Sequence, residues 1–188
     1  YYNLGMIRSF RYRTTSKEYK EAVVLIEKAI EINDRSKAEF GREQTENALY
    51  HYMAGIKYQG LNDDNNAIDH LEKSVILYLR AFGVKNKKTK GAFKEYEDCF
   101  LSMKKKGISR QSGDFDPVLI KESLDKRLQM LPENSPEIIL IRSIFAIIYI
   151  NNGLIHDAEI HLNEANDLIS KIISEKLLTE SYKEAINE

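Results

Sequence analysis

The chain has 188 residues and a mass of 21.8 kDa, with 43% hydrophobic and 30% charged residues, which suits a packed core and excludes a disordered chain. Its 28 lysines and arginines nearly balance 29 aspartates and glutamates, for a net charge of −1, so composition gives no argument for nucleic-acid binding. A single cysteine excludes a disulfide within the chain.

The chain has no evident targeting or membrane segment. The densest apolar run, 138–150, contains Arg142 and is too short to cross a bilayer, and no signal peptide is visible at the start. We therefore expect a cytoplasmic protein that does not bind a membrane. Because residue 1 is tyrosine rather than methionine, we also expect the chain to be part of a longer protein.

Three segments carry apolar residues at the helical spacing i, i+3, i+4, i+7 rather than at the strict alternation of strands. They are Tyr19, Ala22, Val23, Ile26, Ala29 and Ile30; then Ala67, Leu71, Ser74, Val75, Tyr78 and Phe82; and last Ala158, Leu162, Ala165, Ile169 and Ile172. Each segment follows another apolar helical stretch after a short polar break, at 11–16, 60–65 and 151–153. The pattern predicts units of helix, turn and helix.

These units recur with a fixed period. Ala22 and Ala67 are 45 residues apart, and Ala67 and Ala158 are 91 apart, which is about two periods. A further unit is therefore expected between them, made of 90–106, the break 107–116 and a helix over 117–131 with Asp116 as its N-cap. Self-similarity at this period favours a solenoid of helical hairpins.

The matched positions are small, as close helix packing requires. Two helices in a hairpin approach to about 8–10 Å, and their closest crossing has room only for a small side chain. Ala67 and Ala158 occupy this position in the second helices, and Gly55 and Ala146 stand twelve residues before them. Further matched pairs are Tyr58 with Tyr149, Leu71 with Leu162, and Ser74 with Ala165.

This frame resembles the tetratricopeptide repeat (TPR). The residues that carry the resemblance are Ala54, Gly55, Tyr58, Ala67, Leu71 and Ser74, and again Phe145, Ala146, Tyr149, Gly153, Ala158, Leu162 and Ala165. The first unit has Leu4, Gly5, Ala22, Ile26 and Ala29 with five additional residues between its helices, and the third has Ile120 and Leu124 but carries Arg127 where a small residue is expected.

The resemblance implies an all-α fold, namely a right-handed superhelical solenoid of TPR-like helical hairpins. The expected units are about 1–34, 45–83, 90–131 and 137–172, followed by a C-terminal cap over 173–188. This cap either continues the last helix or forms a separate one.

Two families with long repeats fit equally well. The spacing near 45 exceeds the 34 residues of the minimal repeat, and the stretch 78–83, which ends in Phe82 and Gly83, is similar to repeats of the kinesin light chain type. The resemblance implies a protein- or peptide-binding scaffold or adaptor. The alternative is the peptide-sensing TPR receptor domain of a bacterial regulator, and the sequence does not separate the two.

No motif indicates an enzyme, a cofactor or a metal. None of the four histidines, His51, His70, His156 and His161, forms an i, i+4 pair, so ordinary surface or packing histidines are favoured over a metal site. Cys99 lies in an apolar helix, where buried packing is commoner than catalysis.

The acidic segment 63–66 also fails as a calcium loop. Such a loop needs glycine at its sixth position and glutamate at its twelfth, where this chain has Ile68 and Ser74. The segment is predicted to form the turn between two helices and the N-cap of the second helix. The lysine runs 85–90 and 104–106 are expected either to be solvated loops or to meet an acidic partner surface.

A peptide-binding groove is expected on the concave face, which the first helix of each pair lines in such solenoids. The predicted groove residues are Tyr2, Met6, Ser9, Leu49, Tyr52, Ile56, Gln59, Leu101, Lys104, Ser143, Ile147 and Asn151. This mainly apolar set predicts a partner with apolar anchors, flanked by acidic residues that meet Lys104. The alternative is that these side chains pack against neighbouring repeats. The oligomeric state is left open.

Overall fold

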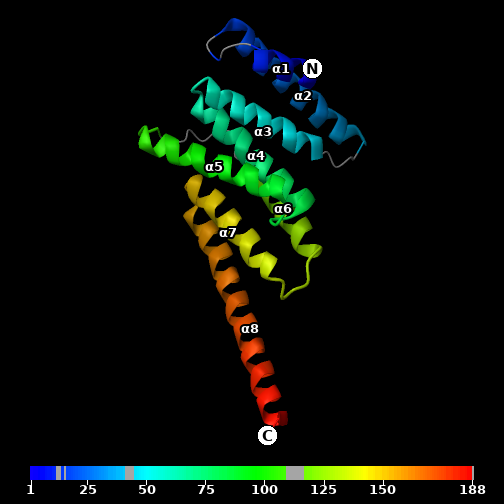
Figure 1. Ribbon diagram of the computed structural model, residues 1–188, viewed down its shortest axis with the longest axis vertical. Coiled ribbons are helices and arrows are strands. Elements are labelled where there is room, and N and C mark those ends of the chain that lie inside the picture. Colours follow the sequence, from blue (N-terminus) through cyan, green and yellow to red (C-terminus); the bar gives the residue numbers. More distant parts are fainter. Residues whose placement is uncertain (12–13, 15, 41–44, 109–116, 188) are drawn as a thin grey trace. The chain divides into compact units, whose positions relative to one another are not determined.

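The computed structural model describes residues 1–11, 14, 16–40, 45–108 and 117–187. Every regular element in these ranges is an α-helix, and no strand occurs there (Figure 1), so the predicted all-α class is confirmed. The helices are α1 Tyr2–Arg11, α2 Lys17–Phe40, α3 Thr45–Gly60, α4 Asp64–Phe82, α5 Lys87–Lys105, α6 Pro117–Gln129, α7 Pro136–Asn151 and α8 Ile155–Asn187. None of these described helices is both long and apolar enough to cross a membrane.

The chain divides into two compact units, Tyr1–Leu119 and Ile120–Glu188. The boundary falls inside α6, so the two helices predicted to form the third repeat belong mainly to different units. The helix predicted over 117–131 does begin at Pro117. Asp116, which was predicted as its N-cap, lies outside the described residues.

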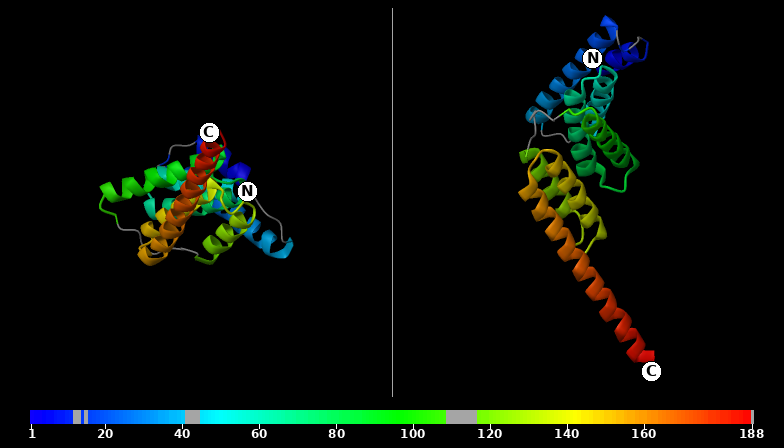
Figure 2. Two further views of the ribbon diagram at one scale, coloured as in Figure 1. Left: turned by 90° about the horizontal axis from the view of Figure 1, so that it is seen from below. Right: turned by 90° about the vertical axis from the view of Figure 1, so that its left-hand side faces the viewer.

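In the first unit each helix packs on its neighbours in sequence, α1 on α2, α2 on α3, α3 on α4 and α4 on α5 (Figures 1 and 2). The α3–α4 crossing is as close as predicted: a Cβ atom on Gly55 would lie 2.6 Å from Leu71 Cγ and 3.1 Å from the Ala67 carbonyl oxygen. Any larger side chain would push the helices apart. Ala67 is fully buried there.

The first hairpin has the same close crossing. A Cβ atom on Gly5 would lie 2.8 Å from the Ala22 carbonyl oxygen and 2.9 Å from Ile26 Cγ1. In the second unit Ala146 and Ala158 are both buried where α7 packs on α8. Gly5 and Gly55 therefore mark positions without room for a larger side chain, and the small residues of the second unit are buried at the corresponding helix contact.

The same type of turn follows α3, α5 and α7. Asn62, Gly107 and Gly153 all have positive φ angles, of 57°, 67° and 76°, and they are 45 and 46 residues apart. In each turn the amide of the next residue donates to a carbonyl five residues back, at 3.0, 3.0 and 2.9 Å. This is the αL geometry of a Schellman cap, which glycine and asparagine tolerate best.

These turns align α5 with α3 and α7. They place Phe100 at the position that Gly55 and Ala146 occupy in the other two helices. The third unit therefore lacks a small residue in its first helix, as well as in the second. After α3, Asp63 caps α4 as predicted, since its Oδ1 accepts from the Asn66 amide at 3.3 Å.

In the second unit Arg127 has a role that the repeat frame did not predict. Its Nη2 lies 2.7 Å from Glu137 Oε1, which joins α6 to the first turn of α7. That turn is fixed by Pro136 and by Ser135, whose Oγ accepts from the Glu137 amide at 3.3 Å. The long side chain of Arg127 therefore forms an ion pair between two helices, and position 127 is not the site of a close helix crossing.

The last helix is continuous through Asn187, so the segment predicted as a cap is the continuation of α8 (Figures 1 and 2). The apolar stripe predicted for α8 lies on a helix, as expected, but it is only partly buried. Leu162 is 40% and Ile169 is 37% exposed, whereas their equivalents Leu71 and Tyr78 are 0% and 3% exposed. In the first unit α4 packs on both α3 and α5, while within its own unit α8 packs mainly on α7.

Candidate functional site

The structure separates the predicted groove residues into two groups. Nine belong to the first unit and three, Ser143, Ile147 and Asn151, lie half-buried on α7 in the second. In the first unit Ser9 is buried, Leu49, Leu101 and Lys104 are exposed, and the other five are half-buried.

The α1 residues of this set pack against neighbouring helices. Tyr2 and Met6 lie against the buried cluster of Ile26, Ile30 and Ala54. The Tyr2 ring stacks on Tyr50, with ring centroids 4.2 Å apart. Ser9 Oγ donates to the Met6 carbonyl at 2.9 Å. For Tyr2, Met6 and Ser9 these contacts favour the packing alternative.

Two of the four α3 residues of this set, Leu49 and Tyr52, line an open pocket, whereas Ile56 and Gln59 do not. The volume of the pocket is about 360 Å³, and helices α3, α4 and α5 all contribute to its wall. The lining residues are Leu49, Tyr52, Tyr78, Lys87, Lys88, Gly91 and Ala92. Two residues predicted from the sequence, Leu49 and Tyr52, are thereby placed at one concave site.

A glycine of α5 stands at the edge of the pocket. The helix begins where Asn86 Oδ1 accepts from the Lys88 amide at 2.8 Å, and Gly91 follows one turn later. A Cβ atom on Gly91 would meet no heavy atom within 4 Å. Glycine is unfavourable in a helix by roughly 0.5–1 kcal/mol relative to alanine, so alanine would fit at this position and favour the helix.

The two phenols in the pocket remain protonated at neutral pH. Burial, and then the nearby charges of Tyr2 and Tyr52, raise the pKa of Tyr78 to about 12. Burial and the Glu95 carboxylate raise the pKa of Tyr52. Both hydroxyls can therefore donate hydrogen bonds to a ligand.

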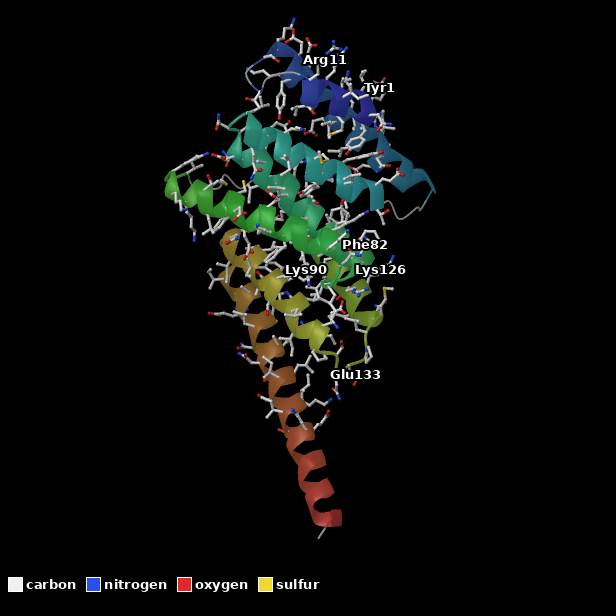
Figure 3. All side chains as sticks on the ribbon, viewed as in Figure 1. Tyr1, Arg11, Phe82, Lys90, Lys126 and Glu133 are labelled. Carbon is white, nitrogen blue, oxygen red and sulfur yellow. The ribbon has the colours of Figure 1, made fainter. Side chains whose placement is uncertain are left out.

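Lysines form the rim of the pocket. Lys87 and Lys88 are exposed, and Lys88 Nζ lies 5.4 Å from the centre of the Phe82 ring at the end of α4, a cation–π distance. Figure 3 labels Phe82 and Lys90, which mark this junction between α4 and α5. An apolar interior with a cationic rim can hold an apolar group and orient a polar one.

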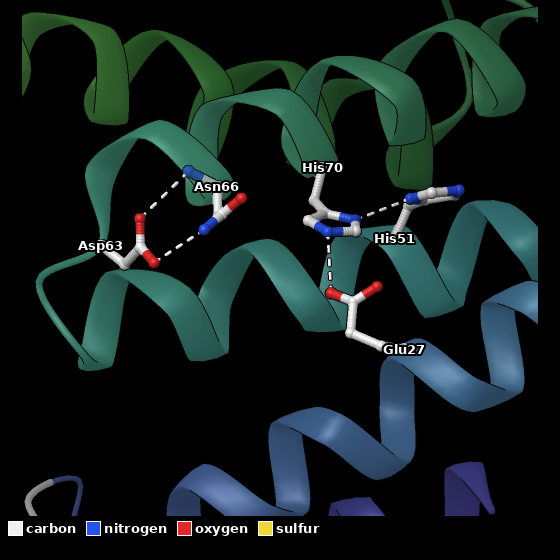
Figure 4. Close-up of polar contacts among 5 residues, drawn as sticks. All are labelled: Glu27, His51, Asp63, Asn66 and His70. Atoms are coloured by element: carbon white, nitrogen blue, oxygen red, sulfur yellow. Dashed lines mark hydrogen bonds and ion pairs between the residues drawn. The ribbon is translucent and has the colours of Figure 1, made fainter. Parts of the chain in front are cut away.

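A second cluster of polar side chains joins α2, α3 and α4 (Figure 4). His51 Nδ1 lies 2.8 Å from His70 Nδ1, so one ring donates and the other accepts. His70 Nε2 lies 2.9 Å from Glu27 Oε1. The Tyr58 ring stacks on His70 with centroids 5.5 Å apart, and its hydroxyl is bonded to Glu27.

Burial and neighbouring charges define the protonation of this cluster. Burial, then the charges of His70 and Lys73, hold the pKa of His51 well below its usual value. Burial opposes ionisation of Glu27, but the hydrogen bond and charge of His70, with Tyr58 and Lys73, lower its pKa overall. Burial and Glu27 raise the pKa of Tyr58. His51 is only 5% exposed, so the cluster links helices rather than meeting a substrate.

The second unit repeats this cluster 91 residues later. Tyr149 stacks on His161 at 5.3 Å, as Tyr58 does on His70. Arg142 stands where His51 stands, with its Nη1 3.4 Å from His161 Nδ1, and it pairs with Glu164. Burial and Arg142 lower the pKa of His161, against the opposite effect of Glu164 and Asp157.

The sequence analysis compared only the small and apolar positions of the repeats, so it did not predict these two clusters. The sequence nevertheless contains a pattern that indicates them. His70 and His161 each stand three residues after the crossing alanine, so extending the same frame to polar residues would have matched them. Their packing role agrees with the interpretation of ordinary packing histidines.

No metal site is indicated by the described residues, because no three His, Cys, Asp or Glu side chains gather there in a way that could hold an ion. Cys99 is buried in α5, as predicted. Comparison of the chain with models of known protein families and with curated proteins finds no match.

Proposed function

We propose that this chain is a protein- or peptide-binding scaffold of the TPR type, which uses the pocket between α3, α4 and α5 as an anchor site. The observation that carries the proposal is the meeting of Leu49 and Tyr52 with Tyr78, Gly91 and Ala92 around one open volume of about 360 Å³. The residues on α3 were selected as groove residues from the repeat frame alone.

The repeat character of the backbone supports the assignment to a solenoid. Turns of the same geometry follow α3, α5 and α7 at intervals of 45 and 46 residues. Small residues stand at the close approaches of α1 to α2 and of α3 to α4. In a TPR solenoid the first helices line the concave face, and α3 and α5 are the first helices of their units.

The binding mode follows from the lining of the pocket. An apolar side chain of a partner would lie between Tyr52 and Tyr78, where its burial is worth about 1.5–3 kcal/mol. The phenol hydroxyls and the lysines of the rim would bind polar groups of the partner backbone or side chains and so fix its orientation. We extend to this chain the expectation from its sequence of a cytoplasmic adaptor that uses no cofactor and catalyses no reaction.

The experiment that tests this function compares two substitutions of Gly91, one that fills the pocket and one that does not. A displayed library of random peptides is selected on the 188-residue chain, and bound peptides are measured against two variants. Gly91→Phe fills the pocket from α5. Gly91→Ala is the matched control, because its added Cβ meets no atom and alanine favours the helix.

We expect selected peptides to lose at least about tenfold in affinity for Gly91→Phe, which corresponds to about 1.4 kcal/mol, and to bind Gly91→Ala like the parent. Circular dichroism confirms that both variants keep their helices. A library that yields no binder contradicts the scaffold function. Binders that are unaffected by Gly91→Phe place the binding surface elsewhere.

A further inference from the structure

The charged side chains that line the pocket between α3, α4 and α5 are both lysines. Lys87 and Lys88 belong to its wall, whose other lining residues are apolar or phenolic. Both lysines are exposed, and within the described part of the chain neither forms an ion pair with a carboxylate. Lys88 Nζ lies over the Phe82 ring, a contact that leaves its charge in place. The rim of the pocket therefore carries two positive charges that a ligand can meet.

These lysines stand in the first turn of α5, where a helix favours negative charge. The partial positive charge at a helix N-terminus attracts anions and repels cations. Helices α3 and α4 follow this rule with Glu46 and Asp64 in their first turns, whereas the first turn of α5 has no acidic residue. The lysine side chains and the helix terminus therefore act in the same direction, and both favour an anionic group at this end of the pocket.

The other end of the pocket has the opposite charge. Glu95 follows Gly91 by one turn of α5, and its carboxylate contributes to the raised pKa of Tyr52. At a rise of about 1.5 Å per residue, Lys88 and Glu95 are about 10 Å apart along the helix. An anionic group is thus favoured beside the lysines and disfavoured beside Tyr52. This polarity orients a ligand that has one charged end.

We propose that the pocket selects an organic anion with an apolar body, which places the body between Tyr52 and Tyr78 and a carboxylate beside the two lysines. The inference rests on the anchor site proposed above and adds the charge of its ligand. Two sources share this chemistry, namely a free organic acid and a peptide in which an acidic residue stands next to an apolar one. The volume of about 360 Å³ admits an aromatic body from either source.

Three compounds with the same naphthyl body and different head groups measure the preference for charge. They are naphthylacetate, which is anionic, naphthylacetamide, which is neutral and similar in shape, and naphthylethylamine, which is cationic. Nuclear magnetic resonance titrations follow the backbone amides of Gly91 and Ala92, which lie in the wall of this pocket. We expect the acid to bind about three- to tenfold more tightly than the amide, as for exposed charge pairs, and the amine to bind most weakly. Added salt should reduce the advantage of the acid, because it screens exposed charges.

Substitution of the two lysines tests their role. Lys87→Gln combined with Lys88→Gln should weaken binding of the acid about three- to tenfold and leave binding of the amide unchanged. The matched control, Lys104→Gln combined with Lys105→Gln, removes the same charge from exposed positions at the other end of α5 and should keep the preference. Glu95→Gln tests the orientation and should change the affinity for the acid less than the loss of the two rim lysines does. Circular dichroism verifies that each variant keeps its helices.

Equal binding of the acid and the amide by the parent overturns this inference and leaves the anchor site in place. A preference for the acid that survives the loss of both rim lysines also overturns it, as does a chain that binds none of the three compounds. The scaffold function itself is decided separately, by the peptide library. Once the preference for the acid is established, the library identifies its source. Selected peptides with aspartate or glutamate beside an apolar residue support a peptide ligand, and selected peptides without them support a free organic acid.

Discussion

The hairpins α3–α4 and α7–α8 use the same backbone frame for different electrostatic purposes. Both place a tyrosine over a histidine, and both end the first helix in an αL turn. In the first unit the histidine lies between His51 and a carboxylate from α2, and in the second it lies beside Arg142. The two hairpins thus share their apolar and turn positions, while the residues at 51 and 142 give the stacked histidines different electrostatic partners.

The largest effect is expected where the two hairpins are alike. Ala67→Arg and Ala158→Arg each force a charged side chain into a closed helix crossing, which should cost on the order of 3–5 kcal/mol, as for other uncompensated buried charges. Urea unfolding followed by circular dichroism measures the loss. The control Ile160→Arg, at an exposed position of α8, should change stability little. An Ala67→Arg chain as stable as the parent would contradict the repeat frame.

The next prediction contrasts the carboxylates of the two clusters. Glu27→Gln removes the charge that His70 and Tyr58 meet and should cost about 1.5–3 kcal/mol, as for a hydrogen bond to a charged group. Glu164→Gln removes the partner of Arg142 at a half-exposed site and should cost under about 1 kcal/mol. Equal costs, measured by urea unfolding, would show that the two clusters contribute alike.

Mild acid should lower the stability of the first unit more than that of the second unit. The pKa of buried His51 is held well below its unfolded value near 6.5, so below this pH the unfolded chain binds a proton that the folded chain does not. Stability should fall with decreasing pH by at most about 1.4 kcal/mol per unit. The depressed pKa of Glu27 extends the loss below pH 4.5, in the same direction.

Unfolding by urea between pH 7 and pH 5.5 measures this dependence. His51→Phe should flatten it in that interval, and His161→Phe should flatten it less, because the charges of Glu164 and Asp157 partly offset the shift at His161. Titration of the four imidazole signals by NMR identifies His51 independently. A steeper dependence in His51→Phe than in the parent would rule out this origin.

The smallest effect concerns the αL turn, where the two hairpins differ by one residue type. Asn62 has φ 57° and its counterpart Gly153 has φ 76°. Replacing Asn62 by glycine should change stability by only a few tenths of a kcal/mol, whereas Gly153→Ala should cost about 1 kcal/mol, since a Cβ atom disfavours this conformation. Thermal melting compares the two variants, and an equally tolerant Gly153→Ala would contradict the assigned turn.

The parts of this molecule that sequence could predict are those set by local spacing. Gly55 and Ala67 meet at a helix crossing and are only twelve residues apart in sequence, so their small size and their spacing can be recognised in the chain. The contact of Glu27 with His70 spans 43 residues and two helices, and periodicity does not specify such partners. The exposure of Leu162 escaped prediction for the same reason, because it depends on the absence of a second packed helix rather than on the pattern of α8.

The buried thiol of Cys99 gives the first unit a built-in kinetic reporter. It is the only thiol in the chain, it lies on the covered side of α5, and it is 1% exposed. A thiol reagent can therefore react only after α5 separates from its neighbours, and the labelling rate at low reagent concentration measures how often that occurs. Because α5 contributes Gly91 and Ala92 to the anchor pocket, a ligand that fills the pocket should slow the labelling of Cys99 without touching it.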